Sequence, residues 1–157
     1  MRDLGELNMN EGGRPVRRSP PTDFQISEFE VHFAVKLPGD YLTFLRQSNG
    51  GNPELGAYQP KGLVQPVLCG VDRFYFLSDD HQDLEGVWQA TREWRTALGK
   101  NIVAIGSDGG GNQILLSFER NPPSVKLCIH DEGMRFIHVA DSFGEFIDML
   151  VEDPDMI

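Results

Sequence analysis

The sequence is short of cysteine, of basic residues and of long apolar runs. Cys69 and Cys128 stand 59 positions apart, without a Cys-x-x-Cys pair or paired histidines nearby. This spacing excludes the common zinc motifs, and we expect each thiol to behave as a small buried apolar group. No run approaches the roughly 18 apolar residues of a membrane-spanning helix, and the opening Met-Arg-Asp-Leu-Gly-Glu is too acidic for a secretory signal. We therefore expect a cytoplasmic, reduced protein.

The scarcity of basic residues restricts the partners. The chain has 14 Lys and Arg against 24 Asp and Glu, a net charge of -10. The first 18 residues hold four of the arginines and three acidic residues, so the remainder has 10 basic against 21 acidic residues, or -11. Such a surface repels nucleic acids and anionic membranes and attracts a basic protein. Acidity that only keeps the protein soluble would leave the same composition.

Length and composition predict one domain preceded by an arm. An apolar fraction of 39% is ordinary for a globular protein, and a chain of this size needs neither a metal nor a disulfide to hold a core. The first residues carry Gly12-Gly13, Pro15 and Pro20 among alternating charges, with no helical or strand period. We predict a flexible arm over residues 1–20 and a single domain over residues 21–153.

A helix pair is predicted to open the domain. Thr22-Asp-Phe-Gln25 has the form of a capping box, and the apolar residues that follow at i, i+3 and i+7 predict a helix to about Val35. These residues are Ile26, Phe29 and Phe33. The second helix follows Leu37-Pro38-Gly39, with Asp40 as its expected N-cap. Asn49-Gly50-Gly51 then provides a left-handed stop.

The rest of the chain predicts a sheet with two further helices. We expect strands over 63–68 and Val71–Leu77, then a helix over Gln82–Leu98 whose buried face comprises Leu84, Val87, Trp88, Thr91, Trp94 and Leu98. We then expect a hairpin of strands 101–105 and 113–118, followed by two more strands at 125–130 and 136–139. A last helix over 142–150 opens with a second capping box. The predicted class is α+β: a central, mainly antiparallel sheet with an N-terminal helix pair, one middle helix and a C-terminal helix packed against it.

The glycine-rich segment Gly106–Asn112 does not have the composition of a phosphate loop. A Walker loop needs Gly-Lys-Ser/Thr where this chain has Gly111-Asn112-Gln113, and Asp108 would repel an anion. The following residues continue as a strand, whereas a dinucleotide fingerprint opens a helix. A turn with positive φ angles is the better explanation.

Four carboxylates gather around His81, at Asp79, Asp80, Asp83 and Glu85. A hard-metal site is conceivable, but the fixed spacing of an EF-hand loop is missing. Carboxylates that favour the N-terminus of the third helix through its dipole would account for the cluster. The same residues are our prediction for part of a partner-binding surface, together with Tyr58 and with Asp108 at the hairpin tip.

Signals for covalent chemistry are weak. Cys128 and His130 could form a dyad, but the chain has no Gly-x-Ser-x-Gly elbow. Trp88 and Trp94 are expected to be core residues or interface anchors, because base stacking would need more basic neighbours than Arg92 and Arg95.

Four sequence pieces carry a family resemblance. They are Ile26–Glu30, then Leu37-Pro38 through Asn49-Gly50-Gly51, then Ile105-Gly106 through Asn112, and last Val139–Phe146. In this order and spacing they resemble the SUKH superfamily. The resemblance implies an α+β fold and a protein that needs no catalytic residue and no cofactor. It also implies a protein partner, because bacterial members look like immunity proteins that bind a co-produced toxin, while fungal relatives act as regulatory scaffolds.

The function predicted from these observations is a non-enzymatic immunity protein that occludes the active site of a basic bacterial toxin. Two alternatives stay open. One is a regulatory or scaffold module of the same family without a toxin partner. The other is a small hydrolase that uses Cys128 and His130.

Overall fold

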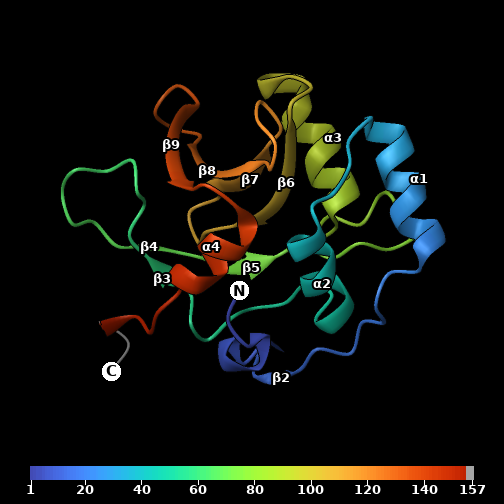
Figure 1. The fold of residues 1–157 in the computed structure, drawn as a ribbon, viewed down its shortest axis with the longest axis horizontal. Coiled ribbons are helices and arrows are strands. Elements are labelled where there is room, and N and C mark those ends of the chain that lie inside the picture. Colours follow the sequence, from blue (N-terminus) through green and yellow to red (C-terminus); the bar gives the residue numbers. More distant parts are fainter. Residues whose placement is uncertain (155–157) are drawn as a thin grey trace.

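The fold was derived from a computed structural model, which describes residues 1–154 (Figure 1). The helices are η1 (Leu4–Leu7, a 3₁₀ turn), α1 (Asp23–Phe33), α2 (Gly39–Gln47), α3 (Val87–Leu98) and α4 (Phe143–Met149). The main sheet contains β5 (Arg73–Phe74), β6 (Ile102–Ser107), β7 (Gln113–Ser117), β8 (Ser124–Ile129) and β9 (Arg135–Ala140). Two small hairpins pair β1 (Asn10–Glu11) with β2 (Arg14–Pro15) and β3 (Ala57–Tyr58) with β4 (Cys69–Gly70).

The main sheet is an antiparallel meander in the order β5-β6-β7-β8-β9, which confirms the α+β class and the predicted C-terminal hairpins. In the β6–β7 hairpin, Val103 pairs with Leu116 and Ser107 with Gln113, and a bulge lies between Ala104 and Gly106. The sheet is buried over most of its length, so its central strands read as continuous apolar runs. Helix α3 packs along β6, and α4 packs on β8 and β9.

Helix α1 begins as its sequence predicts. The Thr22 hydroxyl accepts a hydrogen bond from the Gln25 backbone N–H, and the Gln25 side chain accepts one from the Thr22 N–H, so both halves of the capping box form. The helix ends at Ala34, whose φ of 54° is left-handed. The Glu30 carboxylate then accepts a hydrogen bond from the Leu37 N–H at 2.7 Å, which fixes the turn into α2.

Helix α2 corrects one prediction, because its N-cap is Pro38 and Asp40 lies inside the first turn. From this position the Asp40 carboxylate accepts hydrogen bonds from the first turns of two helices. Its Oδ1 accepts from the Tyr41 N–H at 2.7 Å, and its Oδ2 accepts from the Gly144 N–H at the start of α4 at 2.8 Å. One carboxylate therefore joins the N-termini of α2 and α4, where negative charge is favourable.

The segment Asn49-Gly50-Gly51 follows the end of α2 and also bonds two distant segments of the chain. Asn49 is buried, and its amide N–H groups donate to the carbonyls of Leu77 at 2.8 Å and Ser19 at 2.9 Å. Its amide oxygen accepts from the Leu77 N–H at 2.8 Å. Gly50 has a φ of 81°, and a Cβ there would lie 3.0 Å from the Phe74 carbonyl oxygen. The segment thus joins the end of α2 to the chain that follows β5.

Two aromatic clusters fill the core. The first joins α2, β5 and α4 through rings whose centroids lie 4.9 to 5.3 Å apart in the pairs Phe44–Phe74, Tyr41–Phe143 and Phe44–Phe143. The second joins α1 and α3, where Phe29 and Phe33 pack on Trp88 at 5.5 and 5.1 Å. The first cluster thus packs α2 and α4 against β5, and the second packs α1 against α3.

Three predicted segments differ from the structure. Residues 63–68 form a projecting loop between β3 and β4 (Figure 1), in which Val64, Val67 and Leu68 are exposed. The strand predicted over Val71–Leu77 is regular only at Arg73–Phe74. Helix α3 begins at Val87, and Leu84, predicted on its buried face, lies in the preceding turn and is 82% exposed.

The N-terminal residues 1–20 form more structure than the predicted arm. Leu4 and Leu7 are buried in the main core, and Asn10 exchanges backbone hydrogen bonds with Asn52. The Arg2 guanidinium donates to the Leu150 carbonyl at 2.5 Å. The apolar pair in η1 outweighs the glycines and prolines that suggested an unstructured arm, because burying two leucines contributes roughly 3 to 6 kcal/mol.

We predict that Asn49→Ala lowers the free energy of unfolding by about 2–4 kcal/mol, because it leaves buried backbone groups of Leu77 without partners. Asn49→Asp should be at least as damaging, since a carboxylate keeps the acceptor but cannot donate to the two carbonyls. Urea denaturation measures both, with Gln47→Ala on the exposed end of α2 as control. An Asn49→Ala protein within about 0.5 kcal/mol of the wild type would contradict this role.

Candidate functional site

The acidic segment forms a closed loop, which we define as the acidic loop, residues 78–85. Its base is pinned by backbone hydrogen bonds from the Phe76 N–H to Glu85 and from the Val87 N–H to Phe76. Within it, Asp80 accepts from the Gln82 N–H at 3.1 Å and Asp83 from the Glu85 N–H at 2.9 Å. These carboxylates shape turns in the loop, and the dipole role predicted for them at the α3 N-terminus is wrong because α3 starts only at Val87.

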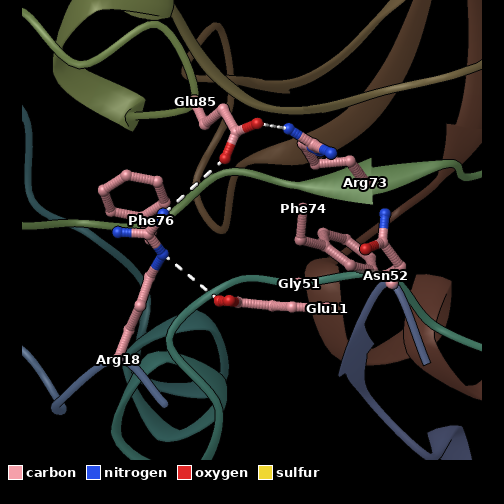
Figure 2. A pocket seen from close by; sticks show the side chains of 9 residues that line it. Glu11, Arg18, Gly51, Asn52, Arg73, Phe74, Phe76 and Glu85 are labelled. Carbon is pink, nitrogen blue, oxygen red and sulfur yellow. Dashed lines mark hydrogen bonds and ion pairs between the residues drawn. The ribbon is translucent and has the colours of Figure 1, made fainter. Parts of the chain in front are cut away.

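Asp79 and Asp80 are exposed, whereas Glu85 is engaged with arginine (Figure 2). Its carboxylate pairs with Arg73 on one side and lies 3.6 Å from Arg18 on the other. The Arg18 guanidinium lies over the Phe76 ring, 3.3 Å from its centroid, and 3.3 Å from the Glu11 carboxylate. Two arginines and two glutamates balance in this pocket, so its role is to fasten the N-terminal residues to the domain.

Tyr58 and Asp108 lie outside the acidic loop: Tyr58 is buried, and Asp108 is half-buried in a separate pocket that Glu54 and Asp72 also line. Tyr58 is fully buried against Phe146, with ring centroids 5.2 Å apart, so its predicted contact with a partner is wrong. Burial raises the pKa of its phenol far above the usual value, with smaller contributions from Cys69 and Asp108. Asp108 accepts hydrogen bonds from the backbone of Gly110 and Asn112 at 2.8 and 2.9 Å, and it therefore shapes the β6–β7 turn.

A groove that the sequence did not reveal lies between α1 and α3. It is lined by Phe24, Ser27, Glu28, Val31, His32, His81, Trp88 and Arg92. His81 comes from the acidic loop and stacks on Trp88, with ring centroids 3.5 Å apart and an interplanar angle of 12°. Its Nε2 lies 2.9 Å from the Glu28 carboxylate of α1. The acidic loop is thus one border of an apolar groove.

The sequence contains one signal for this groove that the prediction did not use. Phe24 and Val31 are seven residues apart, on the opposite side of α1 from the predicted core face. They are 74% and 81% exposed. The partner helix α3 lies more than fifty residues further along the chain, so only the fold brings the second wall to them.

Cys128 and His130, the candidates for covalent chemistry, have structural partners. Cys128 is buried, which raises the pKa of its thiol and disfavours the nucleophilic thiolate. The His130 Nε2 lies 2.9 Å from the Gly110 carbonyl oxygen, and its backbone N–H donates to the Asn112 side chain. Among residues 1–154, no group of three or more His, Cys, Asp or Glu side chains is arranged to hold a metal, and no helix has the length and apolarity to cross a bilayer.

These features define an α+β domain with surfaces suited to macromolecular contacts. The chain belongs to the SMI1/KNR4 family (SUKH-1), which it matches over residues 20–149. It is 28% identical over 174 positions to YokK of Bacillus subtilis (strain 168), described as an SPbeta prophage-derived uncharacterized protein, with 96% of this chain and 84% of the relative covered. Membership confirms the SUKH resemblance and suggests contacts with proteins in general. The domain boundary predicted at residue 20, between the arm and the domain, remains a prediction.

The projecting loop is anchored by charge at its base. The Lys61 ammonium lies 2.9 Å from Asp141 and 2.8 Å from Glu145. Hydrogen bonds from Lys61 lower the pKa of both carboxyls, and those carboxylates raise the pKa of Lys61. The Lys61 and Gly62 backbone N–H groups also donate to Val139 and His138 of β9.

We predict that Lys61→Met lowers the urea midpoint at pH 7 and that its difference from the wild type narrows as the pH falls below about 4, the usual pKa of such carboxyls. The folded-state pKa values of Asp141 and Glu145 are depressed, so their contribution is present above about pH 5 and is lost as the pH falls through those values. Lys36→Met, on the exposed turn before α2, is the control. A difference that stays the same from pH 7 down to about pH 2 would show that Lys61 acts through packing alone.

Proposed function

We propose that this chain is a cytoplasmic, non-enzymatic immunity protein that binds a basic toxin domain and occludes its active site. The observation that supports this most is the acidic loop, because it presents Asp79 and Asp80 to solvent on a closed backbone beside an apolar groove. The net charge of -10 acts in the same direction. Membership of the SUKH family adds a class of proteins that includes immunity proteins.

Occluding an active site requires a surface that complements the toxin in shape and charge, and it requires no covalent reaction. A standard interface buries roughly 800 Å² on each partner, which the acidic loop with the exposed side of α1 could supply. Complementary charge speeds encounter towards about 10⁸ M⁻¹s⁻¹ at low salt. A loop whose turns are already formed by Asp80 and Asp83 would lose little conformational entropy on binding.

The relative YokK is described as prophage-derived, which is consistent with this proposal. A regulatory or scaffold role within the SMI1/KNR4 family is the second candidate. The gene neighbourhood separates the two. A gene for a large protein with a variable C-terminal toxin domain beside this one favours immunity, and its absence favours a scaffold.

The direct test is co-expression with candidate toxin domains in a bacterial host. We expect the wild-type chain to restore growth against one of them and to form a complex that can be purified. If no basic toxin domain, including any encoded beside the gene, is neutralised, the proposal is wrong.

For the neutralised toxin, we predict that Asp79→Asn/Asp80→Asn slows association about tenfold at low salt and that raising salt reduces the difference. Asparagine keeps the side-chain oxygen that Asp80 uses in the loop turn, so the fold should be unaffected. Asp131→Asn/Glu132→Gln removes the same charge from the β8–β9 turn and is the matched control. Stopped-flow kinetics would contradict the proposal if both pairs slowed association equally or if the wild-type rate did not depend on salt.

A further inference from the structure

Helix α1 is apolar on two sides. Ile26, Phe29 and Phe33 face the core and are at most 6% exposed. Phe24 and Val31 lie on the other side, seven residues or about 10 Å apart along the axis, and are mostly solvent-exposed. A surface helix normally has one apolar stripe. The second stripe is therefore unaccounted for by the packing of the described residues.

The groove beside this stripe is held in place by contacts on both walls. The Arg95 guanidinium of α3 donates to the Phe33 carbonyl of α1 at 3.0 Å and to the Ile102 carbonyl of β6 at 3.0 Å. The His81–Glu28 contact ties the acidic loop to α1. Arg92 donates from α3 to the His81 carbonyl. These contacts preform the groove, so a ligand would not have to create it.

Charge on the borders is unbalanced. Exposed carboxylates stand at Asp23 beside Phe24 and at Asp79 and Asp80 beside His81. Among the described residues that line the groove, which include His32 and His81, Arg92 carries the permanent positive charge, and it already donates to His81 and Gln89. Arg46 lies 3.6 Å from the Asp23 carboxylate and offsets only that charge. A segment that enters the groove thus meets an apolar floor between acidic borders.

We propose that the α1/α3 groove binds an amphipathic helix of a partner protein, with apolar side chains at i, i+3 or i+4 and i+7 and with lysine or arginine on its flanks. The two-turn spacing of Phe24 and Val31 matches this pattern of anchors. Strand addition does not fit, because the groove walls are helices whose backbone groups are already paired. This inference rests on the proposed function in that it takes the chain to act by binding a protein, and it names the element recognised.

A second copy of this chain does not suit the groove. An isologous dimer would bring the same acidic borders together, with a net charge of -10 on each copy. Like charges across an interface are costly. The charge argument therefore selects a basic partner and excludes self-association through this surface.

The probe for a binding test is a synthetic helical peptide about 14 residues long, with leucine on one face at the spacing above and lysine elsewhere. Its counterpart with glutamate in place of lysine is the charge control. Titration calorimetry on the full chain measures both. We expect the lysine peptide to bind and the glutamate peptide to bind at least about tenfold more weakly.

Phe24→Ser/Val31→Ser should weaken binding of the lysine peptide at least about tenfold, because the two exposed apolar side chains that line the groove are lost. The control is Val64→Ser/Val67→Ser, which removes two exposed valines from the projecting loop and should leave binding unchanged. All four positions are exposed, so we expect unchanged urea midpoints. Absence of binding, equal binding of the two peptides, or equal loss in both variants would overturn the inference.

The same variants separate this inference from the proposed function. Suppose that no toxin is neutralised, that the lysine peptide binds the wild type, and that only Phe24→Ser/Val31→Ser abolishes this binding. The immunity proposal then fails and the groove assignment stands. If Phe24→Ser/Val31→Ser neutralises a toxin as well as the wild type does, the groove is not the toxin-binding surface and the inference fails while the function stands.

Discussion

The arrangement of this domain depends on the buried side chain of Asn49. Its amide makes three hydrogen bonds, two with the backbone of Leu77 and one with the carbonyl of Ser19. Because Asn49 lies two residues after the end of α2, these bonds fix the N-terminal residues, the helix end and the start of the acidic loop relative to one another. Gly50 and Gly51 allow the close approach, since a Cβ on Gly50 would lie 3.0 Å from both the Phe74 carbonyl oxygen and the Phe76 Cβ.

The other family-like pieces of the sequence have similar explanations in packing. Asp40 bonds the N-terminus of α4 through Gly144, and Phe143 fills the space between Tyr41 and Phe44. The glycine cluster after β6 forms a turn around the Asp108 carboxylate. Residues that a motif search would examine for chemistry therefore build the scaffold. The acidic loop and the α1/α3 groove lie outside this scaffold, and both are bordered by segments that Asn49 and Arg95 hold in place.

What could be predicted from the sequence was local. The capping box at Thr22 and the β6–β7 hairpin are encoded in a few neighbouring residues and form where they were expected. At Ser142 only half of the predicted box forms: the Ser142 hydroxyl accepts from the Glu145 N–H, while the Glu145 carboxylate accepts from the Asp141 N–H. Apolar periodicity failed where apolar residues are exposed, as in the projecting loop and at Leu84. Composition also failed for the N-terminal residues, because two buried leucines decide their position.

The candidate site was predicted only in part for the same reason. The acidic loop was found because its carboxylates are neighbours in sequence. The pairing of Glu85 with Arg18 and Arg73, the burial of Tyr58 and the groove between α1 and α3 all depend on contacts between distant segments. No periodicity or composition in a single sequence encodes these contacts. Local propensity thus placed the elements, and tertiary packing decided which side chains a partner can reach.

The central claim is that the chain acts by presenting a preformed acidic surface to another protein. Hydrogen–deuterium exchange of the full chain, alone and in complex with the toxin domain that it neutralises, measures this most directly. The account predicts slowed exchange in α1 and in residues 78–92, with little change in the main sheet and with the toxin covalently intact. Slowed exchange confined to the Gly109–Gly111 turn and the loop at 63–68, or a covalently altered toxin, would contradict it.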